Sequence, residues 1–398
     1  MNKRVSAVAN LVEPNLYRFT AGCDVDSQLV VIAVYNDDTG AIEVREYPQH
    51  QEGARRATEW LKEQHTEITI LESTANFHQL FYETFRNSNI NAHVINPITI
   101  KALLAVEGKS DRADAINMAR LAAHFRLRTS NMPTEVQKEI RMNLRKWDKD
   151  KQHRSRVCNS MRSMMTAHKV PIFRRVNPNC PSGIDFATLL ARAPDVSPHE
   201  MVDFAWKGRQ NVKPELLRLL ENAPLLPDYV RSELDLALQE LQHLNDLIAA
   251  RHQRAEEHIQ RFRLEPQLAW MTTAPALSQL LGLRIIAEAG ADFHARYHSA
   301  EAFSKACGLA PANLVSAGKL LKSKKGQGNH YIKLHFIRAV KMWMAKPKNE
   351  ALYRWGLAYK ARSGYKRMCT AVAHKSAKSL WHMGRQGGVP YAPKTLRA

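Results

Sequence analysis

An acidic residue set among apolar strand residues limits the folds open to this chain. Asp24 precedes an apolar, β-branched run, Gln28 to Tyr35, that is too short to span a membrane. Asn36 to Gly40 supplies turn-forming residues, and Ile42 to Tyr47 alternates apolar and polar side chains. We therefore predict a hairpin whose buried first strand, Ala21 to Tyr35, carries Asp24. An ionised carboxylate there is costly unless a cation, commonly a metal ion, pairs with it.

Helix and strand patterns alternate after this hairpin. Helical spacing predicts helices at Glu52 to Gln64 and Asn76 to Asn87, and short apolar runs predict strands at Glu67 to Glu72 and Ala92 to Pro97. The closing proline cannot continue a strand ladder. The order strand, strand, helix, strand, helix, strand predicts an α/β domain with a mixed sheet.

Three further carboxylates occupy positions from which they can join Asp24. Glu72 ends a predicted strand, and Asp111 and Asp114 open a predicted helix, where a spacing of three places both on one face. An isolated pair of this kind is more often an ordinary feature of a helix start. Together the four acids form a set that can hold two divalent cations for phosphoryl transfer, and oxygen ligands favour Mg²⁺ or Mn²⁺. The set resembles that of the RuvC-like branch of the ribonuclease H-like nucleases.

Composition indicates a soluble globular protein of two or three domains. Of 398 residues, 44% are apolar and 24% are charged. No segment has the roughly 18 to 20 uninterrupted apolar residues of a membrane helix, and no long apolar core follows the basic N-terminus as in a secretory signal. Five scattered cysteines argue against a disulfide framework and a zinc site. We expect a cytoplasmic protein with no membrane partner.

The net charge of +20 is concentrated near the C-terminal end of the chain. Residues 316–398 contain 19 lysines and arginines and a single acid, Glu350, for a net charge of +18. This polarity predicts a polyanionic partner, foremost a nucleic acid, whose binding weakens steeply with salt. The alternative is a basic surface that serves solubility only, but the near absence of acids is harder to explain in that way.

Long helices are predicted in the middle of the chain. Met132 to Arg175 is strongly basic. Its basic side chains either follow a phosphate backbone or form a solvated helical face, and the sequence favours neither alternative. Its basic residues include Arg141, Arg145, Lys146, Lys149, Lys151, Arg154, Arg156 and Arg162. Asn177 to Pro198 is proline-rich and predicts an irregular connector. Asp228 to Phe262 predicts one long helix whose apolar stripe packs in a helical hairpin or coiled coil, or at a dimer contact.

A loop rich in glycine and lysine near the C-terminal end contains a candidate nucleophile. Leu268 to Pro311 resembles a helix-turn-helix scaffold, and predicted helices begin at His330 and Ala371. Between them, small neighbours of Ser316 permit close approach of a phosphate, so its hydroxyl could act as a nucleophile. The alternatives are a turn or phosphate-contacting serine, and Ser323 competes for the same role. Candidate nucleic-acid contacts here are Lys319, Lys322, Lys324, Lys325 and Lys333.

Taken together, these features resemble the insertion-sequence transposases of the IS110 and IS1111 type, which are related to the Piv DNA invertase. The resemblance extends from about Ala21 to Tyr391. The segments that carry it are Asp24, Glu72, Lys109 to Ala115, Gly308 to Pro311, Ser316 to Lys319 and Lys325 to Asn329. Each segment is modest support, but their order and spacing together are specific.

The resemblance implies a multidomain protein of the α/β plus α class. Residues 15–130 would form a RuvC-like, ribonuclease H-like domain with a mixed sheet. Residues 131–265 would form basic helices and a coiled-coil region. Residues 266–398 would form a mainly α, basic transposase domain that contains the helix-turn-helix-like segment and the serine loop.

The resemblance also implies a reaction. Asp24, Glu72, Asp111 and Asp114 would bind the two metal ions, and Ser316 would attack a DNA phosphodiester to give a phosphoserine intermediate. Expected partners are double-stranded DNA at donor and target sites, a noncoding bridge RNA as guide, and further copies of the chain in a homodimer or homotetramer. Such a protein would associate with the bacterial nucleoid.

Two other functions compete with this one. A RuvC-like nuclease would hydrolyse DNA junctions with water, without a covalent intermediate, and would use the basic region only for binding. A noncatalytic scaffold would retain every activity after Asp24→Ala. Loss of cleavage in Ser316→Ala distinguishes the recombinase from the hydrolytic nuclease.

Overall fold

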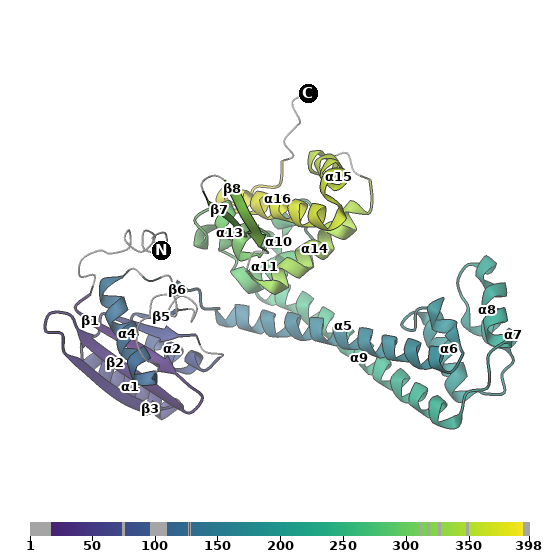
Figure 1. Cartoon of the computed structure of the whole chain (residues 1–398), viewed down its shortest axis with the longest axis horizontal. Coiled ribbons are helices and arrows are strands. Elements are labelled where there is room, and N and C mark those ends of the chain that lie inside the picture. Colours follow the sequence, from purple (N-terminus) through teal and green to yellow (C-terminus); the bar gives the residue numbers. More distant parts are fainter. Residues whose placement is uncertain are drawn as a thin grey trace. The chain divides into compact units, whose positions relative to one another are not determined.

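The computed structural model describes residues 17–73, 76–95, 110–125, 127, 129–310, 312–316, 319–324, 328–347 and 350–392. The chain forms two compact units, Met1–Met132 and Pro133–Ala398 (Figure 1). The first unit is built on a sheet and the second is almost entirely helical. The second unit contains both regions that the sequence divides at residue 265, and this finer division stays a prediction.

The first unit contains a six-stranded mixed sheet. Its strands lie in the order β3-β2-β1-β4-β5-β6. Adjacent strands β1, β4 and β5 are parallel, whereas β2, β3 and β6 pair antiparallel with their neighbours. The strands are β1 (Phe19–Val25), β2 (Leu29–Asn36), β3 (Ile42–Pro48), β4 (Ile68–Glu72), β5 (Ala92–Ile95) and β6 (Thr129–Ser130). The predicted mixed α/β architecture is confirmed.

The predicted single strand from Ala21 to Tyr35 is wrong, because this stretch forms the two antiparallel strands β1 and β2. A tight turn separates them, in which the Asp26 N–H donates to the Leu29 carbonyl at 3.0 Å. Polar, turn-favouring residues at 26–28 interrupt the apolar run. The resulting register pairs Asp24 with Val31, so the carboxylate lies at the end of a central strand.

Helices cover both faces of this sheet. Helices α1 (Gln51–Glu63) and α2 (His78–Asn87) share one apolar core with the sheet. Helix α4 (Asp111–His124) packs on β1 and β2 through a separate cluster that contains Ala115 and Ala119. A Cβ atom on Gly22 would lie 2.2 Å from the Ala115 carbonyl oxygen, so only glycine lets α4 approach β1 this closely. The Thr20 hydroxyl also donates to the Ala119 carbonyl at 2.7 Å.

The second unit is organised around two long helices. Helices α5 (Glu135–Ala167) and α9 (Asp228–Arg261) pack against each other along much of their length (Figure 1). Val230, Leu234 and Leu241 of the predicted apolar stripe are buried in this pairing and against α6. The predicted long helix and its place in a helical hairpin are therefore confirmed.

Short helices occupy the far end of this hairpin. They are η1 (Pro171–Arg174), α6 (Pro181–Arg192), α7 (Pro198–Ala205), η2 (Gln210–Val212) and α8 (Lys213–Glu221). The predicted irregular connector at Asn177 to Pro198 is wrong, because α6 fills most of it. Pro181 stands at the first helical position, where a proline is favoured, and the Cys180 side chain accepts from the Gly183 N–H.

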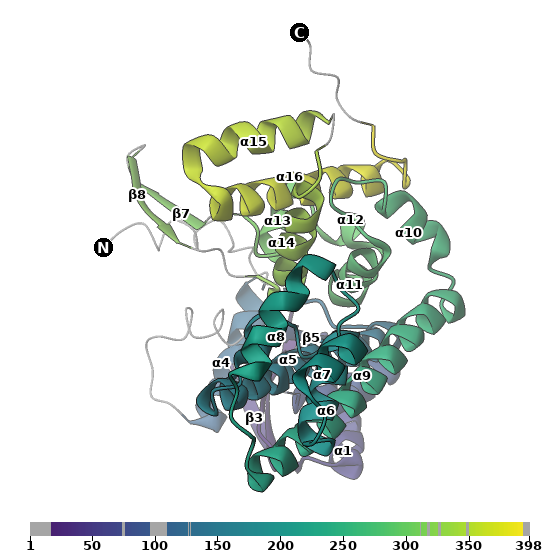
Figure 2. The ribbon, with the colours of Figure 1, turned by 90° about the vertical axis from the view of Figure 1, so that its right-hand side faces the viewer.

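A helical bundle forms the C-terminal part of the second unit. Figure 2 shows α15 lying along α16 and the two-stranded sheet β7–β8 projecting beside the bundle. Its elements are α10 (Glu265–Met271), α11 (Gln279–Ala289), α12 (Phe293–Arg296), α13 (Ala300–Ala306), β7 (Ala312–Ser316), β8 (Lys319–Lys324), α14 (His330–Met344), α15 (Ala351–Ser363) and α16 (Tyr365–Arg385). Across the described part of the chain, no helix combines the length and apolarity needed to cross a bilayer.

Candidate active site

Two of the predicted acids lie at one edge of the sheet. Strands β1 and β4 are parallel neighbours in which Cys23 pairs with Leu71, so Asp24 and Glu72 follow at the same level. The carboxyl ends of parallel strands in α/β sheets commonly form binding sites. These two side chains therefore share the edge at which such sites occur.

Helix α4 adds the other two acids. The Ser110 hydroxyl accepts the Ala113 N–H at 3.1 Å and caps the helix, and Asp111 and Asp114 occupy the first turn. Because α4 lies directly on β1, its N-terminal turn comes close to Asp24. The Ser110 cap and the close approach at Gly22 together position Asp111 and Asp114.

The charges of the other three carboxylates act on Asp24. Burial raises the pKa of Asp24 to about 6, and the charges of Glu72, Asp111 and Asp114 contribute to the increase, in that order. The structure therefore brings the four predicted acids together. Burial, together with repulsion by these three charges, makes ionised Asp24 unfavourable unless a cation is bound.

The donor chemistry of this cluster fits a divalent cation. All four side chains offer carboxylate oxygens, and the pKa of Asp24 is raised by burial and then by negative charges that a cation would neutralise. Within the described residues, no group of three or more Asp, Glu, His or Cys side chains is already arranged to hold an ion. The charge of the site therefore suits Mg²⁺ or Mn²⁺, although the side-chain positions do not form a complete coordination shell.

The candidate nucleophile lies in the other unit, on the β7–β8 hairpin. Ser316 is the last residue of β7 and pairs with Lys319, the first residue of β8. Ser323 pairs with Asn313, nearer the base of the hairpin. Lys322 and Lys324 also lie on β8, and the predicted contact Lys325 lies outside the described residues.

Two glycines close the base of this hairpin. Gly308 precedes β7 with φ of 71°, a left-handed conformation that favours glycine. A Cβ atom on Gly328 would lie 2.3 Å from the backbone nitrogen of Gly308. Next to this contact, the Asn329 N–H donates to the Ala306 carbonyl at 2.7 Å. The chain segments that enter and leave the hairpin are thus held in backbone contact.

A buried carboxylate that the sequence did not reveal joins this base to α5. Glu288 of α11 accepts two hydrogen bonds from Arg145, at 2.9 and 2.8 Å, and one from the Asn329 amide at 2.8 Å. Its side chain is 4% exposed. Burial alone would raise the pKa of Glu288, but the hydrogen bonds from Arg145 and Asn329 and the charge of Arg141 hold it below its ordinary value. No local motif marks this residue, since all its partners are distant in sequence.

Both arginines predicted to contact nucleic acid make internal bonds. Arg141 donates to the carbonyls of Ala287 and Glu288, at 2.6 and 2.9 Å, and Arg145 forms the paired bonds to the Glu288 carboxylate. Lys333 lies in the first turns of α14, with its Cδ near Gly308. Contact of these three side chains with nucleic acid stays a prediction.

A second buried ion pair joins α5, α11 and α14. Arg284 donates two bonds to Asp148, at 2.7 and 2.9 Å, and His335 Nε2 lies 2.9 Å from the same carboxylate. Burial alone would raise the pKa of Asp148, but His335 and Arg284 hold it below its ordinary value. This cluster was also not found from the sequence.

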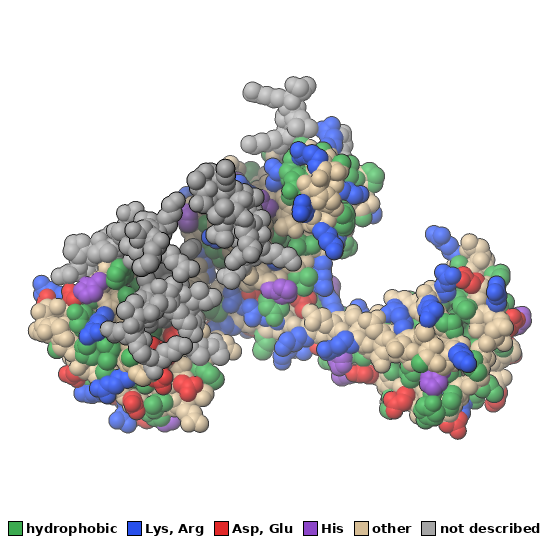
Figure 3. All heavy atoms as spheres, viewed as in Figure 1, with side chains coloured by type: hydrophobic (Ala, Val, Ile, Leu, Met, Phe, Trp, Pro, Cys, Tyr) green, Lys and Arg blue, Asp and Glu red, His purple; other side chains and the backbone are tan. Residues whose placement is uncertain are grey.

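Next to this ion pair, α5 carries a group of cations. The Lys151 ammonium lies 3.6 Å from the centroid of the Trp147 ring. Burial, together with the nearby charges of Arg284, Arg154 and Arg338, lowers the pKa of Lys151 to about 8. An anion bound here would relieve the repulsion between these cations. Lysine and arginine side chains are also prominent over α15 in Figure 3.

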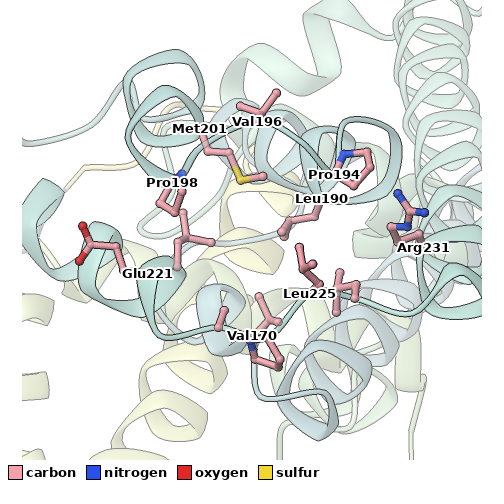
Figure 4. A pocket seen from close by; sticks show the side chains of 13 residues that line it. Val170, Leu190, Pro194, Val196, Pro198, Met201, Glu221, Leu225 and Arg231 are labelled. Atoms are coloured by element: carbon pink, nitrogen blue, oxygen red, sulfur yellow. The ribbon is translucent and has the colours of Figure 1, made fainter.

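The short helices of the second unit enclose an apolar pocket of about 200 Å³. Val170, Leu190 and Met201 are among the side chains that line it, with Glu221 and Arg231 at its margin (Figure 4). None of the predicted site residues lines this pocket. The pocket therefore shares no residue with the carboxylate cluster or with the β7–β8 hairpin that carries Ser316, here called the serine hairpin.

Comparisons with known proteins point to one group of enzymes. Residues 21–169 match a family named DEDD Tnp IS110 and described as a transposase. Residues 269–354 match a second family, described as the transposase IS116/IS110/IS902 family. The chain is also similar to the transposase for insertion sequence element IS1111A from Coxiella burnetii, with 22% identity over 304 residues that cover 76% of this chain and 73% of the relative.

Proposed function

Because this chain belongs to the IS110 and IS1111 type of insertion-sequence transposases, we propose that it cuts and rejoins DNA through metal-assisted attack by Ser316. The observation that carries the proposal is the grouping of Glu72, Asp111 and Asp114 near Asp24, whose pKa is raised to about 6, first by burial and then by the charges of these three acids. Such a cluster is costly in a folded protein and is suited to a site that binds cations.

The proposed metal site assigns the same role to all four acids. When bound by these carboxylates, a pair of Mg²⁺ or Mn²⁺ ions supplies charge neutralisation at the scissile phosphodiester. The sheet edge and the capped start of α4 keep the carboxylates close together. The mixed sheet with acids at its carboxyl edge supports a RuvC-like fold for residues 15–130.

The proposed covalent step uses the serine hydroxyl. Ser316 Oγ forms a bond to phosphorus, the bond to the leaving strand oxygen breaks, and that oxygen becomes a free hydroxyl after it gains a proton. The hydroxyl of the exchanged strand then displaces Ser316, which regains its proton. The position of Ser316 beside the turn of a hairpin supports this role, because the backbone there projects from the helical bundle.

The acids and the serine belong to different compact units, Met1–Met132 and Pro133–Ala398. We propose that the acids of one subunit act with the serine of another, within a homodimer or homotetramer. We further propose that a noncoding bridge RNA guides the protein to donor and target DNA. The high positive charge of residues 316–398 supports binding of both nucleic acids.

A denaturing gel tests the covalent step. Purified protein with its co-expressed RNA is mixed with end-labelled DNA that carries the element junction, in the presence of magnesium. We expect a slowly migrating protein–DNA adduct with the wild type and with the matched control Ser323→Ala, which removes the neighbouring hydroxyl of the same hairpin. We expect no adduct with Ser316→Ala or Asp24→Ala.

The same gel separates the proposed recombinase from its closest alternative. Cleavage without any adduct, undiminished in Ser316→Ala, would identify a hydrolytic RuvC-like nuclease instead. An adduct lost in Ser323→Ala but retained in Ser316→Ala would move the nucleophile to Ser323. Either result would contradict the role proposed for Ser316.

A further inference from the structure

We propose that Glu288 is a positioning residue that fixes the base of the serine hairpin on helix α5. It acts through Asn329, the first residue after the contact between Gly308 and Gly328. The inference rests on the proposed role of Ser316, because a hairpin that presents a nucleophile needs a defined orientation.

Asn329 bonds to both segments that flank the hairpin. The Asn329 N–H bonds the Ala306 carbonyl at the end of α13, which leads into the hairpin. The Asn329 side chain accepts the Ile332 N–H at 3.1 Å and so caps α14, which leads out of the hairpin. Asn329 therefore joins both flanking helices, and any rotation of this residue moves the base of the hairpin.

Glu288 holds the side chain of Asn329 in one orientation. The Asn329 amide donates to Glu288 Oε2 at 2.8 Å, and Arg145 donates to both carboxylate oxygens. Paired bonds between a guanidinium and a carboxylate fix both groups in one plane. Since the Glu288 side chain is 4% exposed, water competes weakly for these bonds.

Arginines of α5 extend this attachment to α14 and α11. Arg145 also lies over the ring of Tyr331, with its guanidinium carbon 4.4 Å from the ring centroid. Arg141 binds the carbonyls of Ala287 and Glu288 and so anchors the end of α11 to the same helix. The start of α14 is thus held from two sides, through Asn329 and Tyr331.

A matched control lies farther along the same helix. His335 also reaches from α14 to a buried acid of α5, Asp148, at 2.9 Å. Asp148 keeps its paired bonds from Arg284 when His335 is removed. His335→Ala therefore weakens the packing of α14 but leaves the contact between Asn329 and Glu288 in place.

Two variants break the proposed link in different ways. Asn329→Ser keeps a hydroxyl that can cap α14 but is too short to reach Glu288 and carries no amide donor. Glu288→Gln keeps the shape of the side chain but removes its charge and one acceptor for Arg145. Because the two changes affect different partners, failure of one variant to fold still leaves the other as a test.

Two measurements on the full-length chain test the inference. We expect amide hydrogen exchange in residues 312–324 to accelerate about tenfold in Asn329→Ser and Glu288→Gln, as for loss of a hydrogen bond to a charged group. With the DNA and bridge RNA bound at saturation, we expect the rate of adduct formation to fall about 10-fold to 100-fold, with DNA affinity changed less than about twofold. His335→Ala should leave both the exchange and the rate near wild type.

Each outcome has a distinct meaning. Wild-type exchange in both variants, or fast exchange with an unchanged adduct rate, would overturn the positioning role. A loss of rate in His335→Ala equal to that in Asn329→Ser would also overturn it, because general stability would then explain the effect. An adduct that survives Ser316→Ala would instead refute the proposed function, which the exchange measurement does not depend on.

Discussion

Replacement of Asp24 by asparagine should stabilise the first unit when divalent cations are removed. Burial and the charges of Glu72, Asp111 and Asp114 raise the pKa of Asp24 from 3.8 to about 6. Without any correction for solvent screening, this difference in pKa corresponds to about 3 kcal/mol of unfavourable free energy for the ionised side chain. Because the side chain is only half-buried, solvent screening reduces the expected gain to about 1 to 1.5 kcal/mol.

The pH dependence of this gain has a definite sign. A carboxyl whose pKa is higher in the folded state binds its proton more strongly there, so its ionisation destabilises the fold. The wild-type chain therefore loses stability as pH rises from 3.8 to about 6, and the full loss persists above that window. The difference between Asp24→Asn and wild type should be largest at pH 7.5 and should vanish below about pH 4.

Urea unfolding in EDTA measures the difference in stability between Asp24→Asn and wild type. Unfolding is monitored by amide exchange of β1 and β4, because these strands report on the first unit alone. Asp26→Asn is a matched control, since it removes an exposed acid two residues away. Magnesium should stabilise the wild type and reduce the advantage of Asp24→Asn. If Asp24→Asn in EDTA at pH 7.5 is no more stable than wild type, the four carboxylates do not repel one another and the argument for a cation site fails.

Three further substitutions test other parts of the structure. Gly22→Ala should destabilise the first unit by about 1 to 3 kcal/mol in urea unfolding, because its Cβ would overlap the Ala115 carbonyl; an unchanged midpoint would contradict the close approach. Asp148→Ala should cost about 3 to 5 kcal/mol, since it leaves Arg284 buried without its carboxylate; a loss below about 1 kcal/mol would contradict this. Lys151→Gln should weaken nucleic-acid binding and reduce the slope of log K against log salt by about 1; an unchanged slope would place the phosphates elsewhere.

Much of the carboxylate cluster could be predicted from the sequence because its positions follow from local patterns. Predicted strands carry Asp24 and Glu72, and a serine cap precedes Asp111 and Asp114. Parallel pairing of neighbouring strands then brings the strand ends to one edge, without any knowledge of the rest of the chain. Helix α9 could also be predicted from the sequence, because its apolar stripe repeats over many turns.

Other parts depended on competition between local signals. The polar residues at 26–28 interrupt the apolar run only briefly, so β1 and β2 were predicted as one strand. Helix α6 was hidden by its prolines, although Pro181 at a first helical position favours the helix that follows. In both cases residue composition alone predicted the wrong secondary structure, because the positions of a few residues determine where the turn and the helix begin.

The buried ion pairs could not be predicted, because their partners are distant in sequence. Arg145 and Glu288 lie 143 residues apart, and Asp148 and Arg284 lie 136 residues apart. From the sequence alone, the arginines of α5 could form a solvated face or a DNA-binding face, because arginine is found on both kinds of surface as well as in buried ion pairs. Only tertiary packing shows that Arg141 and Arg145 hold α11 and the start of α14.

The division of charge between the two units separates nucleic-acid binding from the metal-dependent cleavage step of the proposed reaction. Residues 1–132 contain 14 lysines and arginines and 16 acids, a net charge of −2, so residues 133–398 carry +22. The second unit must therefore supply nearly all of the electrostatic attraction for nucleic acid. The carboxylate cluster repels a phosphodiester until cations neutralise it. We expect removal of magnesium to abolish cleavage while binding persists, because the basic residues and the proposed cation site lie in separate parts of the chain.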